Sequence, residues 1–174
     1  MTASLARLLR QSISNEDEVV PLAREVEYAK GYLTIQKMRY KDKLEFEIDV
    51  EPSILNIPLI KLVLQPIIEN AIYHGLKYKE SKGLLQVKGF MKDGNAVLQV
   101  IDNGVGMDEE TLSHIYDKHK VNYHSNGVGV YNVQKRLKLY YGENYGITYE
   151  SEKGVGTTAT ITIREYRRNQ YEKT

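Results

Sequence analysis

The chain has 174 residues, which is enough for one compact domain with a buried core, so a single functional site is expected. Its 24 basic and 23 acidic residues leave a formal charge of +1, so the composition gives no electrostatic footprint for nucleic acid or an anionic membrane. The absence of cysteine excludes disulfides and thiolate metal sites, and no run reaches the roughly 18 apolar residues of a membrane span.

The first fifty residues predict two helices and a strand. Leucines at helical spacing predict a short helix over residues 4–11, and a second helical pattern covers residues 21–40. The stretch LEFEIDV, Leu44–Val50, alternates strictly and predicts a strand with one solvent-facing side. The apolar stripe of the longer helix is Leu22, Val26, Ala29, Leu33 and Met38.

The middle of the chain predicts a buried helix and a hairpin. Residues 58–75 are apolar on nearly every side, which indicates a buried helix that Pro66 kinks or splits. Two strand patterns follow, over 84–92 and 95–102, and Asp-Gly-Asn between them is typical of a tight turn. We therefore predict a β-hairpin here.

The last part of the chain adds two helices and two strands. Asp108 is placed to cap a short helix, and residues 117–126 are polar and aperiodic, which predicts a mobile loop. A helix over 130–141 and strands over 146–151 and 157–165 follow. Because hairpins predominate, we predict an α+β fold: a two-layer sandwich of a mixed, mostly antiparallel sheet with helices on one face.

The stretch VIDNGVGM is unusual because an apolar strand ends in Asp102 and two glycines follow at once. Gly104 and Gly106 would let the backbone pass close to a flat ligand. The carboxylate would accept a hydrogen bond from an exocyclic amine, such as that of adenine. Taken alone, Asp-Asn-Gly is also ordinary turn chemistry.

A second glycine cluster, NGVGVYN, leads into a helix, where free backbone amides favour phosphate oxygens. A dinucleotide-binding motif would need a strand directly before Gly127 and a third glycine at position 132. The chain has a polar loop and Asn132 at these places, so that hypothesis fails.

The stretch LQPIIENAIYHG contains a third group of polar residues. Asn70 and His74 share one helix face, and an amide oxygen is a hard ligand suited to Mg²⁺. The alternatives are that Asn70 satisfies buried backbone groups and that His74 is structural.

Together these motifs resemble a known family. ENAIYHG, DNGVGM, NGVGVYN and GVGTTATITI have the order and spacing of the N, G1, G2 and Gly-Thr boxes of the histidine-kinase and gyrase (Bergerat-type) ATP-binding fold. The upstream EVEYAKGYLTIQKMRYKDKLEFEIDVEP resembles sensor histidine kinases of the LytS/YehU/YesM type. The resemblance implies an end of the dimerisation region and a linker helix over 1–40, an ATP-binding catalytic domain over 41–166, and a tail over 167–174.

The resemblance also implies roles for individual residues. Asn70 would coordinate Mg²⁺ and Glu69 would order its water shell, as the catalytic pair. Asp102 would hold the adenine amine, with Thr157 sharing a bridging water, and residues 117–126 would form the ATP lid. The implied ATP-binding residues are Asn70, Tyr73, His74, Asp102, Gly104, Gly106, Met107, Lys118, Asn126, Gly127, Val128, Gly129, Val130, Asn132 and Thr157.

Two positions depart from the family pattern. Many histidine kinases carry lysine where this chain has Tyr73, so Lys77 or a lid lysine is expected to compensate. Gyrase-type ATPases carry a water-activating glutamate where this chain has Pro66, and proline cannot act as a base. This departure favours phosphoryl transfer to a protein over ATP hydrolysis.

The resemblance implies ATP and Mg²⁺ as cofactors and a response regulator as partner. The phosphorylated histidine is expected upstream, in a dimerisation domain, so we expect this chain to bind ATP without phosphorylating itself and to be monomeric, within a homodimeric parent. The parent is expected to be membrane-anchored with its kinase part in the cytoplasm. The alternatives are a serine kinase of the anti-sigma-factor type and an interaction module without nucleotide.

Overall fold

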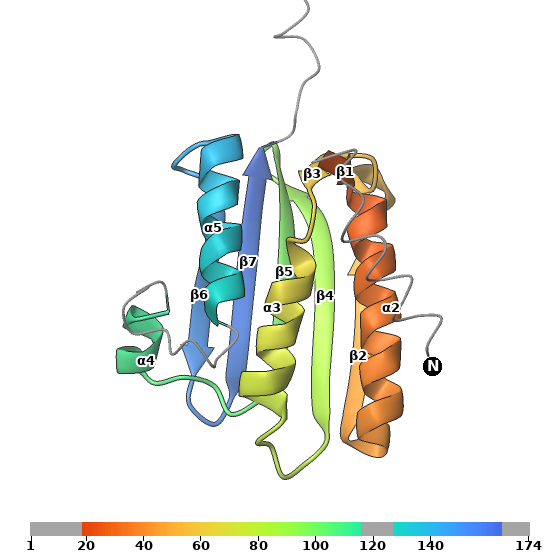
Figure 1. Cartoon of the computed structure of the whole chain (residues 1–174), viewed down its shortest axis with the longest axis vertical. Helices are drawn as coiled ribbons and strands as arrows, with labels where there is room; N and C mark the ends of the chain where they lie inside the picture. The colour runs from red at the N-terminus through yellow and green to blue at the C-terminus, as the bar shows by residue number, and fades with distance from the viewer. Residues whose placement is uncertain (1–18, 116–126, 165–174) are drawn as a thin grey trace, which may run out of the picture.

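Five strands form the central sheet within the described residues, 19–115 and 127–164 of a computed structural model (Figure 1). Their order across the sheet is β2-β4-β5-β7-β6, with β2 parallel to β4 and every other neighbouring pair antiparallel. The prediction of a mixed, mostly antiparallel sheet is confirmed. The strands are β2 (Leu44–Val50), β4 (Gly83–Lys92), β5 (Asn95–Asp102), β6 (Gly146–Glu152) and β7 (Gly156–Arg164).

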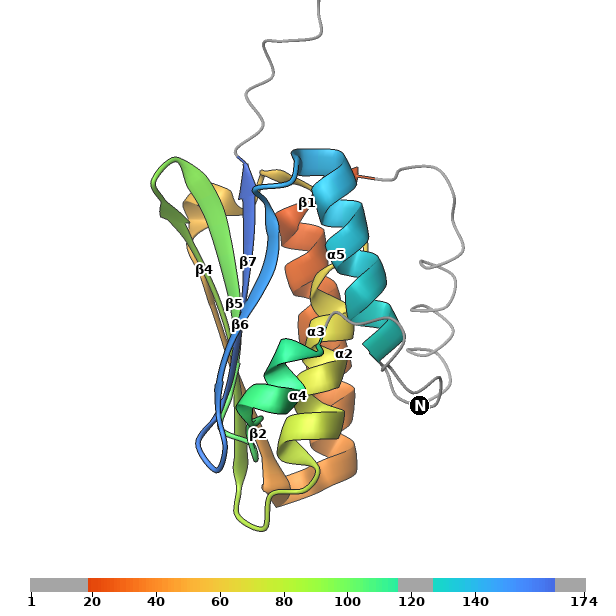
Figure 2. The ribbon, with the colours of Figure 1, turned by 90° about the vertical axis from the view of Figure 1, so that its left-hand side faces the viewer.

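The long helices cover one face of this sheet, which confirms the predicted two-layer α+β fold (Figure 2). The core lies between the layers, where apolar side chains of the helices meet those of alternate strand positions. No helix in the described ranges combines the length and hydropathy needed to cross a membrane. The helices are α2 (Leu22–Tyr40), α3 (Leu64–Asn70), α4 (Glu109–Ser113) and α5 (Gly127–Tyr141), with 3₁₀ turns at Lys41–Lys43 and Pro52–Ile54.

The hairpin of β4 and β5 forms as the turn chemistry predicts. Asp93 and Gly94 both have positive φ, 50° and 74°, and they are the two residues between the strands. A two-residue turn of this kind matches the twist of the flanking strands. The hairpin brings the end of β5, and with it Asp102, to the same end of the sheet as the start of β4.

The helix predicted over 58–75 is wrong at its start. Pro58–Ile60 is a strand, β3, which pairs antiparallel with β1 (Val19–Pro21) in a separate two-stranded sheet. Leu62 has a φ of 59°, and this left-handed residue separates the strand from α3. Pro66 causes no kink because it is the third residue of α3, where its missing N–H would have no acceptor within the helix. A π-helix, Ala71–Leu76, continues α3.

The buried stripe of α2 differs from the predicted one. Met38 is 71% exposed, whereas Glu25 and Gln36 are buried at 2% and 6% exposure, beside Leu22, Ala29 and Leu33. The helix also lacks a side-chain N-cap. The N–H groups of Leu22 and Ala23 instead donate to backbone carbonyls of the loop before β3.

Two further expectations differ from the structure or lie outside it. The helix expected to begin at residue 130 begins at Gly127, so both glycines of the second cluster belong to its first turn. The predicted helix over 4–11, the loop over 117–126 and the tail over 167–174 lie outside the described residues.

Candidate functional site

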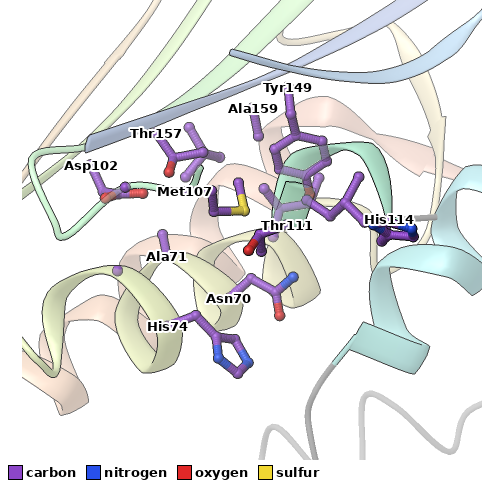
Figure 3. Close-up of a pocket in the computed structure, with 15 residues that line it drawn as sticks. Asn70, Ala71, His74, Asp102, Met107, Thr111, His114, Tyr149, Thr157 and Ala159 are labelled. Atoms are coloured by element: carbon purple, nitrogen blue, oxygen red, sulfur yellow. The ribbon is translucent and has the colours of Figure 1, made fainter. Parts of the chain in front are cut away.

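A cavity of about 380 Å³ lies between α3 with its π-helix and the sheet ends at β5, β6 and β7 (Figure 3). The short helix α4 closes it on a further side. Six residues that the sequence singled out line this cavity, and they come from the two motifs upstream of the expected lid, ENAIYHG and DNGVGM, and from the Gly-Thr box. They are Asn70, His74, Asp102, Gly106, Met107 and Thr157.

Asp102 is the buried acid of the cavity. Asp102 is 6% exposed, and its Oδ1 accepts a hydrogen bond from the N–H of Gly104 at 2.8 Å. Burial raises the pKa of Asp102 to about 6, although the backbone N–H groups of Gly104 and Thr157 act in the opposite direction. Thr157 pairs with Asp102 across β5 and β7, so the two residues are adjacent on the sheet. The carboxylate therefore offers an acceptor at the closed end of the cavity.

Three glycines allow the backbone to approach this carboxylate. A side chain at Gly75 would place its Cβ 2.7 Å from Oδ1 of Asp102. A Cβ at Gly104 would overlap the backbone of Gly75, and one at Gly106 would overlap the carbonyl of Glu152. Gly106 also has a φ of 63°. These contacts explain why glycine stands at 104 and 106, as the sequence suggested, and they add Gly75.

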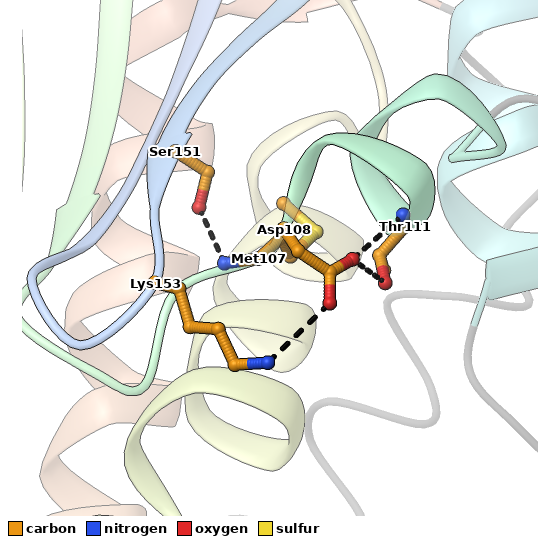
Figure 4. A network of polar contacts seen from close by, with 5 residues as sticks. All are labelled: Met107, Asp108, Thr111, Ser151 and Lys153. Atoms are coloured by element: carbon orange, nitrogen blue, oxygen red, sulfur yellow. Dashed lines mark hydrogen bonds and ion pairs between the residues drawn. The ribbon is translucent and has the colours of Figure 1, made fainter.

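A polar network fixes the chain that leaves this glycine pair (Figure 4). The N–H of Met107 donates to Ser151 Oγ at 2.9 Å, which ties the segment to β6. Asp108 caps α4 by accepting from the N–H of Thr111 at 2.9 Å, as predicted, and Lys153 lies 3.5 Å from its other carboxylate oxygen. The pKa of Asp108 is lowered, first by the Thr111 hydroxyl. The cavity wall from Met107 to α4 is therefore held in place without a ligand.

Asn70 is the polar residue on the helical wall. Its Oδ1 is buried and has no hydrogen-bond partner among the described residues. A buried amide oxygen is normally paired, so an acceptor left open in a cavity is a place for a ligand or ion. No group of three or more His, Asp or Glu side chains within 19–115 and 127–164 could hold a metal. An ion at Asn70 would therefore need its other ligands from a bound molecule and water.

His74 lies one helical turn beyond Asn70 and lines the same cavity. Burial, with the nearby charge of Lys77, lowers the pKa of His74 below its ordinary value. The imidazole is therefore neutral at pH 7, and it offers a hydrogen bond rather than a positive charge.

Glu69 and Tyr73 lie outside the cavity lining and face α2 instead. Gln65 donates to Glu69 Oε1 at 3.0 Å, and the hydroxyls of Tyr32 and Tyr73 share a hydrogen bond. Burial, together with Glu69 and Tyr73, raises the pKa of Tyr32. The structure therefore does not bring Glu69 or Tyr73 together with Asn70 in the cavity.

The second glycine cluster also lies outside the cavity lining. Val130 is buried in the core at 1% exposure and Asn132 is exposed, while a Cβ at Gly129 would lie 3.3 Å from Cβ of Pro66. Gly127 and Val128 begin α5, and Lys118 and Asn126 lie outside the described residues.

Nine further residues line the cavity that the sequence did not assign to it. Strand alternation could have found two of them, because Val100 and Ala159 are two positions from Asp102 and Thr157 and share their faces. Tyr149 pairs with Ala159, but that register is not readable from sequence. The nine are Ile67, Ala71, Gly75, Val100, Thr111, His114, Ile115, Tyr149 and Ala159.

The profile of the family described as "Histidine kinase-, DNA gyrase B-, and HSP90-like ATPase" matches residues 56–167, and that of "Histidine kinase" matches residues 1–44. The sensor histidine kinase YesM of Bacillus subtilis is 32% identical over 94% of this chain and 27% of its own length. The sensor protein LytS of Oceanobacillus iheyensis is 34% identical over 80% of this chain and 24% of its own length. The chain thus spans about a quarter of these relatives.

Among solved structures, the catalytic domain of histidine kinase ThkA aligns with a TM-score of 0.65 at 13% identity, over 86% of this chain and 99% of that chain. At this identity the likeness shows the fold alone. It shows that the layered arrangement of sheet and helices recurs in a histidine kinase catalytic domain.

Proposed function

Since this chain belongs to the family of histidine kinase-, DNA gyrase B- and HSP90-like ATPases, we propose that it is the ATP-binding catalytic part of a two-component sensor histidine kinase. The observation that carries the proposal is the buried Asp102, which lines the cavity together with Gly75 and Gly106. The similarity to YesM and LytS over most of the chain supports the same assignment.

Asp102 binds the adenine base in this proposal. An ionised carboxylate only accepts hydrogen bonds, so it selects the exocyclic amine of adenine over the carbonyl that guanine carries at the same ring position. Gly104 and Gly106 let the chain after Asp102 pack closely against Gly75 and Glu152, which forms the wall beside the base, and Val100, Ala159 and Tyr149 supply apolar and aromatic contacts. Thr157, adjacent to Asp102, shares a water with the base.

Asn70 binds Mg²⁺ carried by the triphosphate. The fit rests on two observations: Asn70 lines the cavity, and its Oδ1, a hard acceptor, is buried without a hydrogen-bond partner among the described residues. When bound, the ion neutralises phosphate charge and helps to hold the terminal phosphate in position. His74 adds a neutral hydrogen bond, and Gly127 and Gly129 in the first turn of α5 let the backbone there approach the phosphates.

The reaction proposed is transfer of the terminal phosphate to a histidine in a dimerisation domain, followed by relay to a response regulator. Pro66 stands one turn before Asn70, in the first turn of α3, so this position offers no base to activate water. The absence of a base there supports transfer over hydrolysis. Glu69, bonded to Gln65, remains a proposed partner of the metal's water shell.

The proposal extends to the whole protein. The histidine kinase match ends at residue 44 and the ATPase match begins at residue 56, while α2, which ends at Tyr40, packs into the core. We infer a homodimeric sensor whose kinase part faces the cytoplasm.

The decisive experiment is calorimetric titration of the chain with adenosine and with ATP, with and without Mg²⁺. Wild type should bind both, and Mg²⁺ should strengthen only ATP binding. Asp102→Ala should abolish binding of both ligands. Asn70→Ala should keep adenosine affinity and lose the Mg²⁺ effect. Equal losses of both affinities in the two variants would contradict the roles, and no binding by wild type would contradict the function.

A further inference from the structure

Glu25 of α2 is a charged side chain in the core. Glu25 is 2% exposed, and its carboxylate accepts three hydrogen bonds from backbone N–H groups. The N–H of Leu62 donates to Oε1 at 2.8 Å, and the N–H groups of Val63 and Leu64 donate to Oε2 at 2.9 and 3.2 Å. A buried carboxylate is retained only where its oxygens are satisfied in this way.

The three donors are the groups that open α3. Val63 is the N-cap residue and Leu64 the first residue of the helix, and their N–H groups have no acceptor within it. No side chain of the local sequence caps this end, so Glu25 does so from another helix. Its negative charge lies at the positive end of the helix dipole. Leu62 is held at its positive φ by the same carboxylate.

The start of α2 binds the other end of the same segment. The N–H of Leu22 donates to the carbonyl of Ile57, and that of Ala23 donates to the carbonyl of Leu55, each at 2.9 Å. Residues 55–64 are therefore bound to the first turn of α2 at both ends. Burial raises the pKa of Glu25, while the three backbone N–H groups and the charge of Arg136 of α5 act in the opposite direction.

Asn70 lies less than two turns beyond Leu64, on the same continuous helix. We propose that Glu25 is a positioning residue, which sets the place of the Asn70 amide by fixing the first turn of α3. This inference rests on the proposed function, because it assigns to Glu25 the metal-dependent part of nucleotide affinity. Asp102 itself belongs to β5, and α3 reaches it only through Gly75 of the π-helix, so we expect the adenine contacts to change less than the position of Asn70.

The test uses Glu25→Gln in the same chain, which keeps the volume and removes the charge. We expect Mg²⁺-dependent ATP affinity to fall roughly tenfold, as for changes that displace the residues supporting a metal ligand. Adenosine affinity should stay within roughly twofold, since no adenine contact is touched. Glu25→Asp, which keeps the charge but shortens the reach, should give an intermediate loss and serves if the glutamine variant does not fold.

Two controls separate positioning from general stability. Glu51→Gln makes the same change at an exposed carboxylate that also accepts a backbone N–H, that of Met91, and should leave both affinities unchanged. Ile163→Val removes one methylene from the core near the opposite end of the sheet and should lower Tm without altering the Mg²⁺ effect.

A double variant gives the sharpest result. If Glu25 acts through Asn70, then Glu25→Gln should have no further effect on ATP affinity in an Asn70→Ala background. Additive losses would overturn the inference, as would equal losses for adenosine and Mg·ATP. A wild type that binds no nucleotide would instead reject the proposed function, so the two failures are distinguishable.

Discussion

Gly104 and Gly106 lie against backbone, whereas Gly129 lies against one proline ring. A Cβ at either of the first two would overlap main-chain atoms, while a Cβ at Gly129 would meet Pro66 at 3.3 Å. Both clusters have the same Gly-x-Gly spacing in the sequence. The difference teaches that the first pair is required by the fold itself, before any ligand binds. At Gly129 of the second pair, a Cβ would require only a small shift of the Pro66 ring, so the fold constrains this position less.

The largest effect is expected at Gly106. Gly106→Ala should destabilise the fold by more than about 4 kcal/mol, because the Cβ overlaps the Glu152 carbonyl and the residue has a positive φ. Gly154→Ala is the matched control: its φ is also positive, at 83°, but a Cβ there has open space among the described residues. It should cost only about 1 kcal/mol. Urea unfolding measures both, and equal costs would break the comparison.

The second largest effect is expected for Asp102→Asn, which should weaken adenosine binding rather than destabilise the fold. The amide is close in shape, but it places a donor where adenine needs an acceptor, so adenosine affinity should fall at least roughly a hundredfold. The fold should remain, because an amide oxygen can still accept from the N–H of Gly104. Calorimetry with circular dichroism tests this, and undiminished affinity would show that Asp102 does not hold the base.

A smaller effect is expected from pH. Burial raises the pKa of Asp102 to about 6, so below pH 6 most of the free chain holds a proton that must be released when adenine binds. Adenosine affinity should therefore weaken roughly tenfold between pH 7 and pH 5. Stability has the opposite sign: the native state binds this proton more tightly than the unfolded chain, so ionising Asp102 lowers stability as pH rises toward 6. The stability of wild type minus that of Asp102→Asn, followed against pH, isolates this contribution.

The smallest effect on folding is expected at Gly129. Gly129→Ala gains about 1 kcal/mol of helix propensity in α5, against a tight contact with Pro66, so Tm should change little. Mg·ATP affinity should nevertheless fall severalfold if the backbone there approaches phosphate. A large loss of Tm would show that the second pair is as structurally constrained as the first.

The elements that local chemistry determines could be predicted from sequence. The β4–β5 hairpin follows from Asp93-Gly94, and the helix α4 follows from its Asp108 cap. The error at 58–63 has a physical cause, since apolar residues there form a strand only because β1, some forty positions earlier, pairs with them. Local patterns carry no information about that partner.

The site divides in the same way. Asp102, Gly104 and Gly106 could be singled out because they occur together with three other motifs in one order and spacing, although Asp-Asn-Gly alone is ordinary turn chemistry. The burial of Glu25 could not be predicted, because glutamate on a helix usually faces solvent. Only the folded chain brings the backbone N–H groups of Leu62, Val63 and Leu64 to its carboxylate. The outward direction of Tyr73 likewise depends on its contact with Tyr32 of another helix.

The short ladder between β1 and β3 connects the start of β1, at Val19, to the segment that leads into α3 and so to one wall of the cavity. Val19 pairs with Ile60, and on the other edge the Tyr141 hydroxyl accepts from the N–H of Ile60 and donates to the carbonyl of Pro58. A force that displaces β1 must therefore either break its pairing with β3, which involves three residues of each strand, or displace β3 as well. Because only residues 61–63 separate β3 from α3, displacing β3 would tilt the helix that bears Asn70.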